Sequence, residues 1–163
     1  MPRDVEAAGG LEHSASTVYS LNPAAGRLDV AVDLVLKNVK PNDASGRYFF
    51  FAVLLDLESV ATDIQVSADS GPVSITLLER GTTFNLYAVS FDAIYYGQSR
   101  HLTVTYRVPG GAPRSTSSTR VGLAYANFCV YGNGEDSGSV SGRAPSSFTF
   151  TNTAASRSEE HTS

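Results

Sequence analysis

The sequence predicts an all-β protein, an antiparallel two-sheet β-sandwich of about eight or nine strands, with a β-barrel as the second choice. Residues 27–39 (RLDVAVDLVLKNV) carry apolar side chains at every even position from 28 to 36, which is the two-residue period of a strand. Val, Thr, Ser, Tyr and Phe are abundant, and such side chains pack well on a pleated surface. Turn-forming segments separate the apolar runs along the chain.

Length and composition agree with one globular domain. The 163 residues are 42% hydrophobic and 17% charged, enough to bury a core. The net charge of −4 argues against a nucleic-acid surface, which needs a basic patch. Cys129 is the single cysteine, so an internal disulfide is excluded, and we expect it to be a small buried strand residue. The sequence has no run near the roughly 20 apolar residues of a spanning helix.

The first elements predict a hairpin. Residues 17–21 (TVYSL) form a short strand, residues 22–26 (NPAAG) form the turn, and residues 27–39 form the returning strand. In that strand the even residues from Leu28 to Leu36 are expected to be buried, and Asp29, Asp33 and Lys37 to be exposed. Residues 40–46 then form a loop.

The middle of the chain predicts three further strands after an apolar run. Residues 48–55 (YFFFAVLL) read as a strand buried on both faces or as a short internal helix, and the three consecutive Phe favour the strand or an aromatic-rich bulged segment under the sheet. Residues 56–62 have room for one helical turn. Residues 62–67 alternate again. Residues 73–80 and 83–91 flank a tight turn and predict a β-hairpin.

The next segments predict a connector and a second cleanly alternating strand. Residues 92–99 form the connector, and residues 100–108 form the strand. His101 lies on its outward face and is expected to be solvated. The inward residues are Leu102, Val104, Tyr106 and Val108.

The last third of the domain alternates between loops and strands. Residues 109–119 (PGGAPRSTSST) predict a surface loop, and residues 120–131 predict a strand. Residues 132–138 form a Gly-rich acidic loop, and residues 147–151 form a last short strand.

The two ends of the chain are set apart from the domain, which we place at 16–152. Residues 1–15 are small and polar and are expected to be loosely ordered, as is a tail at 153–163. The last seven residues, 157–163 (RSEEHTS), resemble the translation of a common sequencing adapter. We therefore expect the tail to be artefactual from residue 157, and the natural chain to be truncated near Ser156.

No arrangement of residues predicts catalysis. His13, His101 and His161 lack the H-E-x-x-H spacing of a zinc hydrolase. Residues 138–142 (GSVSG) have the glycines of a nucleophile elbow, but Val140 stands where the serine would be. We predict no catalytic residue, no cofactor and no enzymatic activity in this segment.

Two sets of residues are candidates for binding. Asn133, Glu135 and Asp136 could offer oxygen ligands to Ca²⁺, but the sequence favours a solvated hairpin loop over a metal site. Tyr95 and Tyr96 offer rings that stack on sugars, although such tyrosines also occur as ordinary sheet aromatics.

Three stretches together resemble a known family: YSLNPAAGRLDVAVDLVLKN, FDAIYYGQSRHLTVTYRVPGG and RVGLAYANFCVYGNGEDSGSV. They are similar to the amino-terminal β-sandwich region of secreted or membrane-anchored bacterial proteins related to gluzincin (M1-type) metallopeptidases, over most of residues 17–142. The first motif is Y-x-L-x-P and the second is Y/P-G-Q-x-x-x-L-x-V-x-Y. Their positions here are Tyr19, Leu21 and Pro23, then Tyr96, Gly97, Gln98, Leu102, Val104 and Tyr106.

The resemblance implies a non-catalytic accessory domain. In such enzymes the zinc ligands and the catalytic glutamate lie in a later helical domain, which has no counterpart in this sequence. The implied partner is a downstream domain of the same polypeptide. The implied location is extracellular or at the cell surface, with the signal peptide lost upstream of Met1. The alternative is a carbohydrate- or ligand-binding module.

Overall fold

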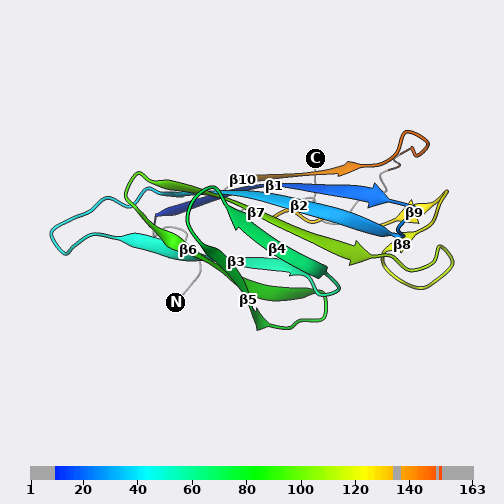
Figure 1. Ribbon diagram of the computed structural model, residues 1–163, viewed down its shortest axis with the longest axis horizontal. Helices are drawn as coiled ribbons and strands as arrows, with labels where there is room; N and C mark the ends of the chain where they lie inside the picture. The colour runs from blue at the N-terminus through cyan, green and yellow to red at the C-terminus, as the bar shows by residue number, and fades with distance from the viewer. Residues whose placement is uncertain (1–9, 134–136, 150, 152–163) are drawn as a thin grey trace.

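The computed structural model describes residues 10–133, 137–149 and 151. All the regular elements in these residues are β-strands. The described residues contain no helix that is long and apolar enough to cross a membrane. The strands follow one another along the chain as in Figure 1. They are β1 (Leu11–Asn22), β2 (Arg27–Asn38), β3 (Phe49–Glu58), β4 (Thr62–Ala68), β5 (Val73–Glu79), β6 (Phe84–Tyr95), β7 (Ser99–Pro109), β8 (Arg120–Val121), β9 (Ala126–Asn127) and β10 (Ser137–Arg143).

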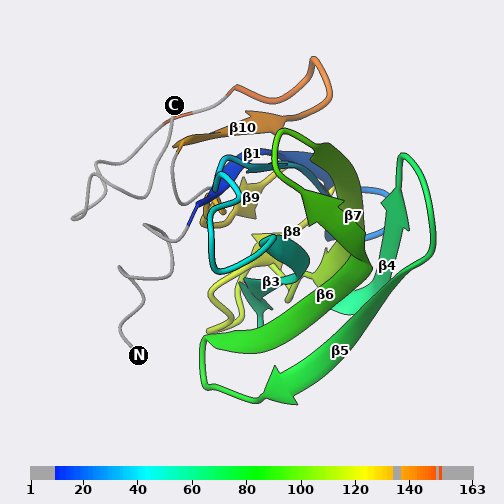
Figure 2. The ribbon, with the colours of Figure 1, turned by 90° about the vertical axis from the view of Figure 1, so that its left-hand side faces the viewer.

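The strands form a β-sandwich, as predicted. One sheet has the order β10-β1-β2-β7-β4, the second has the order β3-β6-β5, and β8 pairs with β9. Figure 2 shows the two main sheets curving around a common interior, with β4 and β5 next to each other where the sheets meet. One pair departs from the antiparallel pattern, because β10 runs parallel to β1.

The core is built from the inward residues of both sheets. All five even residues from Leu28 to Leu36 on β2 are buried, and so are all four predicted inward residues of β7. Asp33 and Lys37 are exposed as expected, whereas Asp29 is half-buried. The other sheet contributes Val53, Leu55, Leu57, Tyr87, Val89, Phe91 and Ile94.

The β1–β2 hairpin is confirmed, but β1 begins at Leu11 and not at residue 17. Its turn is closed by the Gly26 N–H, which donates to the Pro23 carbonyl at 3.1 Å, and Gly26 has a φ of 67°. Residues 11–15, expected to be loosely ordered, therefore belong to the sheet. Their inward side chains include Ala15, whose small size hides the alternation in the sequence. Residues 1–9 and the tail 153–163 lie outside the described residues.

The predicted strand at residues 48–55 is confirmed as β3, with an irregularity between Phe50 and Ala52, but its burial on both faces is wrong. On β3, Val53 and Leu55 are buried, whereas Phe49, Phe51 and Leu54 are about half exposed. The physical reason is that the three-stranded sheet turns only one face to the core. The strand runs on to Glu58 and ends in a turn, so residues 56–62 contain no helical turn.

The predicted β5–β6 hairpin is confirmed, but β6 is longer than expected. It continues to Tyr95, because Phe49 and Phe50 of β3 pair with Tyr95 and Ile94 beyond an irregularity. The predicted connector at 92–99 therefore shrinks to residues 96–98.

The C-terminal part of the domain differs most from the prediction. Residues 120–131 do not form one strand, because the Gly122 N–H donates to the Tyr125 carbonyl at 2.7 Å and the chain turns back, leaving the short β8–β9 pair. The predicted loop at 132–138 ends earlier than expected, because β10 begins at Ser137. The Ser and Gly residues of β10 have low strand propensity, and its Val140 reaches the core. Residues 147–149 and 151, part of the predicted last strand, are not in a strand.

Candidate functional site

An open depression lies on the outer face of the five-stranded sheet. It has a volume of about 350 Å³ and crosses β1, β2, β7 and β4. Because side chains alternate along a strand, most residues that line it are ones that the core does not use, and Val30 and Tyr106 are the buried exceptions. The lining residues are Val18, Ser20, Asp29, Val30, Ala31, Asp63, Gln65, Thr105, Tyr106 and Arg107.

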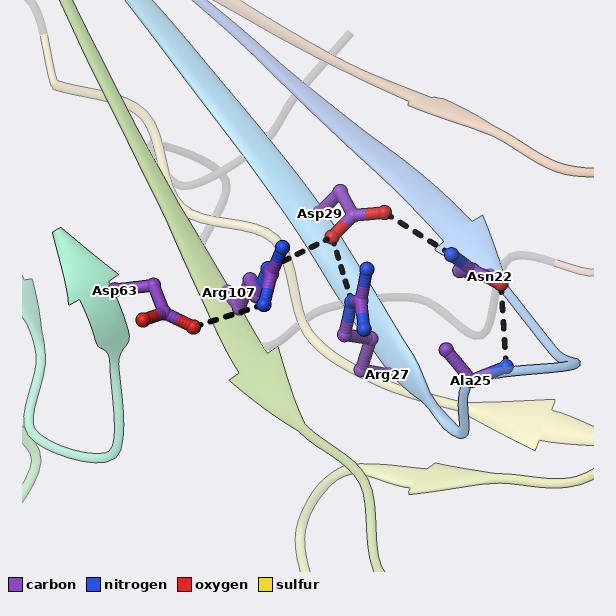
Figure 3. Close-up of polar contacts among 6 residues, drawn as sticks. All are labelled: Asn22, Ala25, Arg27, Asp29, Asp63 and Arg107. Carbon is purple, nitrogen blue, oxygen red and sulfur yellow. Dashed lines mark hydrogen bonds and ion pairs between the residues drawn. The ribbon is translucent and has the colours of Figure 1, made fainter. Parts of the chain in front are cut away.

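Arg107 on β7 lies between two carboxylates in this depression (Figure 3). Its Nη1 donates a hydrogen bond to Asp63 Oδ2 on β4 at 2.9 Å. Its Nε lies 4.0 Å from Asp29 Oδ1 on β2. The guanidinium group thus connects three neighbouring strands of the sheet.

Asp63 reaches Arg107 because β4 is irregular at this point. Thr62 pairs with Arg107 and Gln65 pairs with Thr105, so Asp63 and Ile64 lie opposite the single residue Tyr106. Asp63 has a φ of 53°, in the left-handed region that aspartate tolerates better than most residues. The bulge therefore directs the Asp63 carboxylate toward the neighbouring strand.

Asp29 is also held from the other side. Arg27 Nε donates to Asp29 Oδ1 at 2.8 Å, and Asn22 Nδ2 donates to Oδ2 at 3.3 Å. Partial burial by itself would raise the pKa of Asp29, but the hydrogen bonds from Arg27 and Asn22 outweigh it, so this pKa lies below its ordinary value. Asn22 Oδ1 in turn accepts a hydrogen bond from the Ala25 N–H in the hairpin turn at 3.2 Å.

This cluster can offer charges of both signs to a polar ligand, but its charges already pair with one another. Arg27 pairs with Asp29, and Arg107 pairs with Asp63. Exposed pairs of this kind each contribute at most about 1 kcal/mol. The ion pairs are therefore better suited to holding the edge strand β4 against β7 than to catalysing a reaction.

A second polar cluster, absent from the sequence-based candidates, lies between the sheets. Glu58 at the end of β3 is 8% exposed and accepts hydrogen bonds from the hydroxyls of Tyr19 and Tyr106, each at 2.6 Å. Burial, and then the nearby Glu58 charge, raise the pKa of Tyr19 above its ordinary value. Burial is also the largest cause of the raised pKa of Tyr106. In the sequence, this cluster could have been recognised only from an acidic residue at the end of an apolar strand together with two tyrosines on inward faces.

The two candidate sugar-stacking tyrosines lie at the end of β6 and differ in exposure. The Tyr95 ring contacts Phe49, with centroids 5.6 Å apart, and Arg47 lies 4.5 Å from its centroid on a face of the ring. Tyr96 is more exposed, next to the turn at Gly97. Tyr95 is therefore engaged in contacts within the protein, and Tyr96 has the more accessible ring.

The remaining candidates are not brought together into a site. Asn133 is half-buried, and Glu135 and Asp136 lie outside the described residues. Among the described residues no group of three His, Cys, Asp or Glu side chains is placed to hold a metal ion. His101 is exposed as expected, 3.7 Å from Asp33. Cys129 is exposed and not buried, because it lies after β9 in a segment where Phe128 and Val130 face the core.

Among the comparisons with known proteins, only the one with solved structures finds a likeness. No family model matches the sequence, and no curated protein matches it. A two-domain M1 zinc metallopeptidase variant bound to L-tryptophan is 16% identical, with a TM-score of 0.41, over 64% of this chain and 22% of that chain. An M1 zinc metallopeptidase variant from Deinococcus radiodurans bound to a Tyr-Ser-Ala substrate is 15% identical, with a TM-score of 0.41, over 66% of this chain and 23% of that chain. The chain thus spans about a quarter of the length of these structures.

Proposed function

We propose that this chain is a non-catalytic β-sandwich module that docks onto another domain of a longer polypeptide. The supporting observation is a set of large apolar side chains exposed at one end of the sandwich, which we call the turn end. Its members are Val60, Leu78, Leu123 and Tyr125, and Leu123 is 79% exposed. Exposed apolar side chains that gather in one region are typical of interaction surfaces.

The strand register explains why these side chains share one end. Thr62 at the start of β4 pairs with Arg107 near the end of β7. Glu58 at the end of β3 pairs with Phe84 at the start of β6. The turn that carries Val60, and the last residues of β5 that include Leu78, therefore lie toward the end of the sandwich where β7 runs out toward β8 and β9 (Figure 1).

The kind of parent protein is proposed on sequence grounds. The quoted strand and turn motifs support an exported M1-type metallopeptidase whose catalytic part is a separate helical domain. Reading the gene beyond Ser156 tests this proposal. A following segment that lacks a helical H-E-x-x-H motif would contradict it, and would leave the docking proposal standing.

Hydrogen exchange tests the docking proposal directly. We expect residues 58–62 and 120–127 to exchange more slowly in the full gene product than in the isolated module, because docking shields the turn end. Residues 99–105 of β7 serve as the internal control. Equal exchange of the turn end in both proteins would refute docking at this end.

A second candidate function, sugar binding, is favoured by the exposure of Tyr96. This ring is about half exposed, as are Phe49 and Phe51 on the adjacent strand. Aromatic side chains exposed in one region suit the apolar faces of a sugar ring.

A further inference from the structure

In the part of the chain that the structure describes, β3 lies at an unpaired edge of the three-stranded sheet. Among the described residues it pairs with β6 alone. In an antiparallel strand about half of the backbone N–H and C=O groups point to each side, so about half of those in β3 point away from β6. An edge of this kind is a template for a further strand.

Strand β3 has little of the usual protection of an edge strand, apart from an irregularity between Phe50 and Ala52 and the charge of Asp56. Phe49, Phe51 and Leu54 point outward, and Phe51 is 56% exposed. Residues 49–58 (FFFAVLLDLE) contain neither lysine nor proline, the residues that most often block edge pairing. In Figure 1 the first half of β3 lies away from the end that carries β8 and β9.

We propose that two copies of this chain pair antiparallel through β3, about a twofold axis between residues 51 and 52. This register places Arg47 of each copy opposite Asp56 of the other, and Phe49 opposite Leu54. Each of these residues is exposed, so exposed side chains meet exposed side chains. The two three-stranded sheets then become one continuous sheet.

Charge selects this register over its neighbours. Arg47 lies two residues before β3 and Asp56 lies near its end, so antiparallel pairing brings opposite charges together twice, once on each side of the axis. Shifting the register by two residues would place Asp56 opposite Phe49, without a cation. The test of this pairing is separate from the docking test, because it measures the oligomeric state of the isolated chain and not the protection of the turn end.

Sedimentation velocity over a range of protein concentrations tests the pairing. We expect a monomer–dimer equilibrium for the unaltered chain. The substitutions Arg47→Glu and Asp56→Arg, made separately, should each raise the dimer Kd by about tenfold, because each places like charges opposite one another at both pairs. A mixture of the two variants should restore a tighter heterodimer, because the two pairs, one on each side of the axis, then each join opposite charges.

The double variant Arg47→Glu with Asp56→Arg is the sharper restoration test. It reverses both pairs while keeping them complementary, so its Kd should return to within about threefold of the unaltered chain. Circular dichroism shows whether each variant is folded. If one single variant does not fold, the double variant still tests the proposal.

Edge-blocking variants provide the matched control. Phe51→Lys should abolish the dimer, because a charged side chain would then sit at the twofold axis in both copies. Ser74→Lys on β5, the other end strand of the same sheet, should leave the Kd unchanged. A chain that is monomeric at every concentration, or a dimer that survives Phe51→Lys, would overturn the proposal.

Discussion

The carboxylate of Glu58 accepts a hydrogen bond from the hydroxyl of Tyr106 at 2.6 Å, between strands that belong to opposite sheets. Its other oxygen accepts from Tyr19, and the Tyr19 hydroxyl in turn accepts from the Tyr131 N–H at 3.3 Å. A buried carboxylate is stable only when its hydrogen bonds are made. The three side chains therefore hold β3 against β1 and β7.

Removing one hydroxyl from this network should destabilise the fold. We expect Tyr106→Phe to lower the free energy of unfolding by about 2 kcal/mol, because a buried carboxylate loses a charge-assisted hydrogen bond. Urea denaturation measures the change. Tyr96→Phe, which alters an exposed ring, is the control and should have little effect; an equally small effect of Tyr106→Phe would show that the network does not stabilise the sandwich.

Stability should fall at alkaline pH. Burial raises the pKa of Tyr19 and Tyr106 above the ordinary value of 10.0. Above pH 10 the unfolded chain loses these protons and the folded chain keeps them, so the unfolded state binds fewer protons and the free energy of unfolding decreases as pH rises. The loss is about 1.4 kcal/mol per pH unit for each tyrosine.

Urea denaturation at pH values from 8 to 11 measures that slope, and Tyr106→Phe separates the two tyrosines. Below pH 10 the contribution is fully present, so the curve should be flat with respect to these groups. Above pH 10, the free energy of unfolding of the Tyr106→Phe variant should fall less steeply with pH, because only Tyr19 of the two tyrosines then contributes. A slope that is the same in both proteins would mean that Tyr106 ionises as readily folded as unfolded.

The periodicity of the sequence predicts the sheets well and the polar clusters poorly. The parity of residues 28–36 and 102–108 was enough to place the core, because burial of one face determines register. The contacts of Glu58 with Tyr19 and Tyr106 join residues 39 and 48 positions apart, and no local pattern encodes them. Asp63 meets Arg107 only because of a bulge, which shifts which residues face each other.

Two predictions were wrong for the same reason, because a local pattern does not encode contacts with distant parts of the chain. The apolar run at 48–55 indicated burial on both faces, but local composition does not say whether a second layer covers the outer face of a sheet. The strand β10 went unpredicted because its residues, SGSVSGR, have low strand propensity, and its pairing with β1 is supplied by distant residues.

A charge in the centre of β2 should unfold the protein or nearly so. Val32 is fully buried between β1 and β7, so we expect Val32→Asp to cost about 4 kcal/mol or more as an unpaired buried charge. Val35→Asp, on the opposite face of the same strand at 46% exposure, is the matched control and should cost less than about 1 kcal/mol. Thermal unfolding compares them, and an unchanged melting temperature for Val32→Asp would contradict the strand assignment.

Glycan binding distinguishes the two candidate functions. A docking module should show no saturable binding on a glycan array. If binding is found, Tyr96→Ala should abolish it, whereas Tyr95→Ala should weaken it less, because the Tyr95 ring already contacts Phe49 and Arg47. Binding that disappears in Tyr96→Ala would favour the sugar-binding module over the docking module.

The backbone at Asp63 supplies the last prediction. At a φ of 53° a β-branched residue is strained, whereas glycine is not. Asp63→Val should therefore lower the free energy of unfolding by about 1–2 kcal/mol, and Asp63→Gly should change it by less than about 1 kcal/mol, although both remove the ion pair with Arg107. Equal losses in urea denaturation would show that the ion pair, and not the backbone conformation, determines the choice of aspartate here.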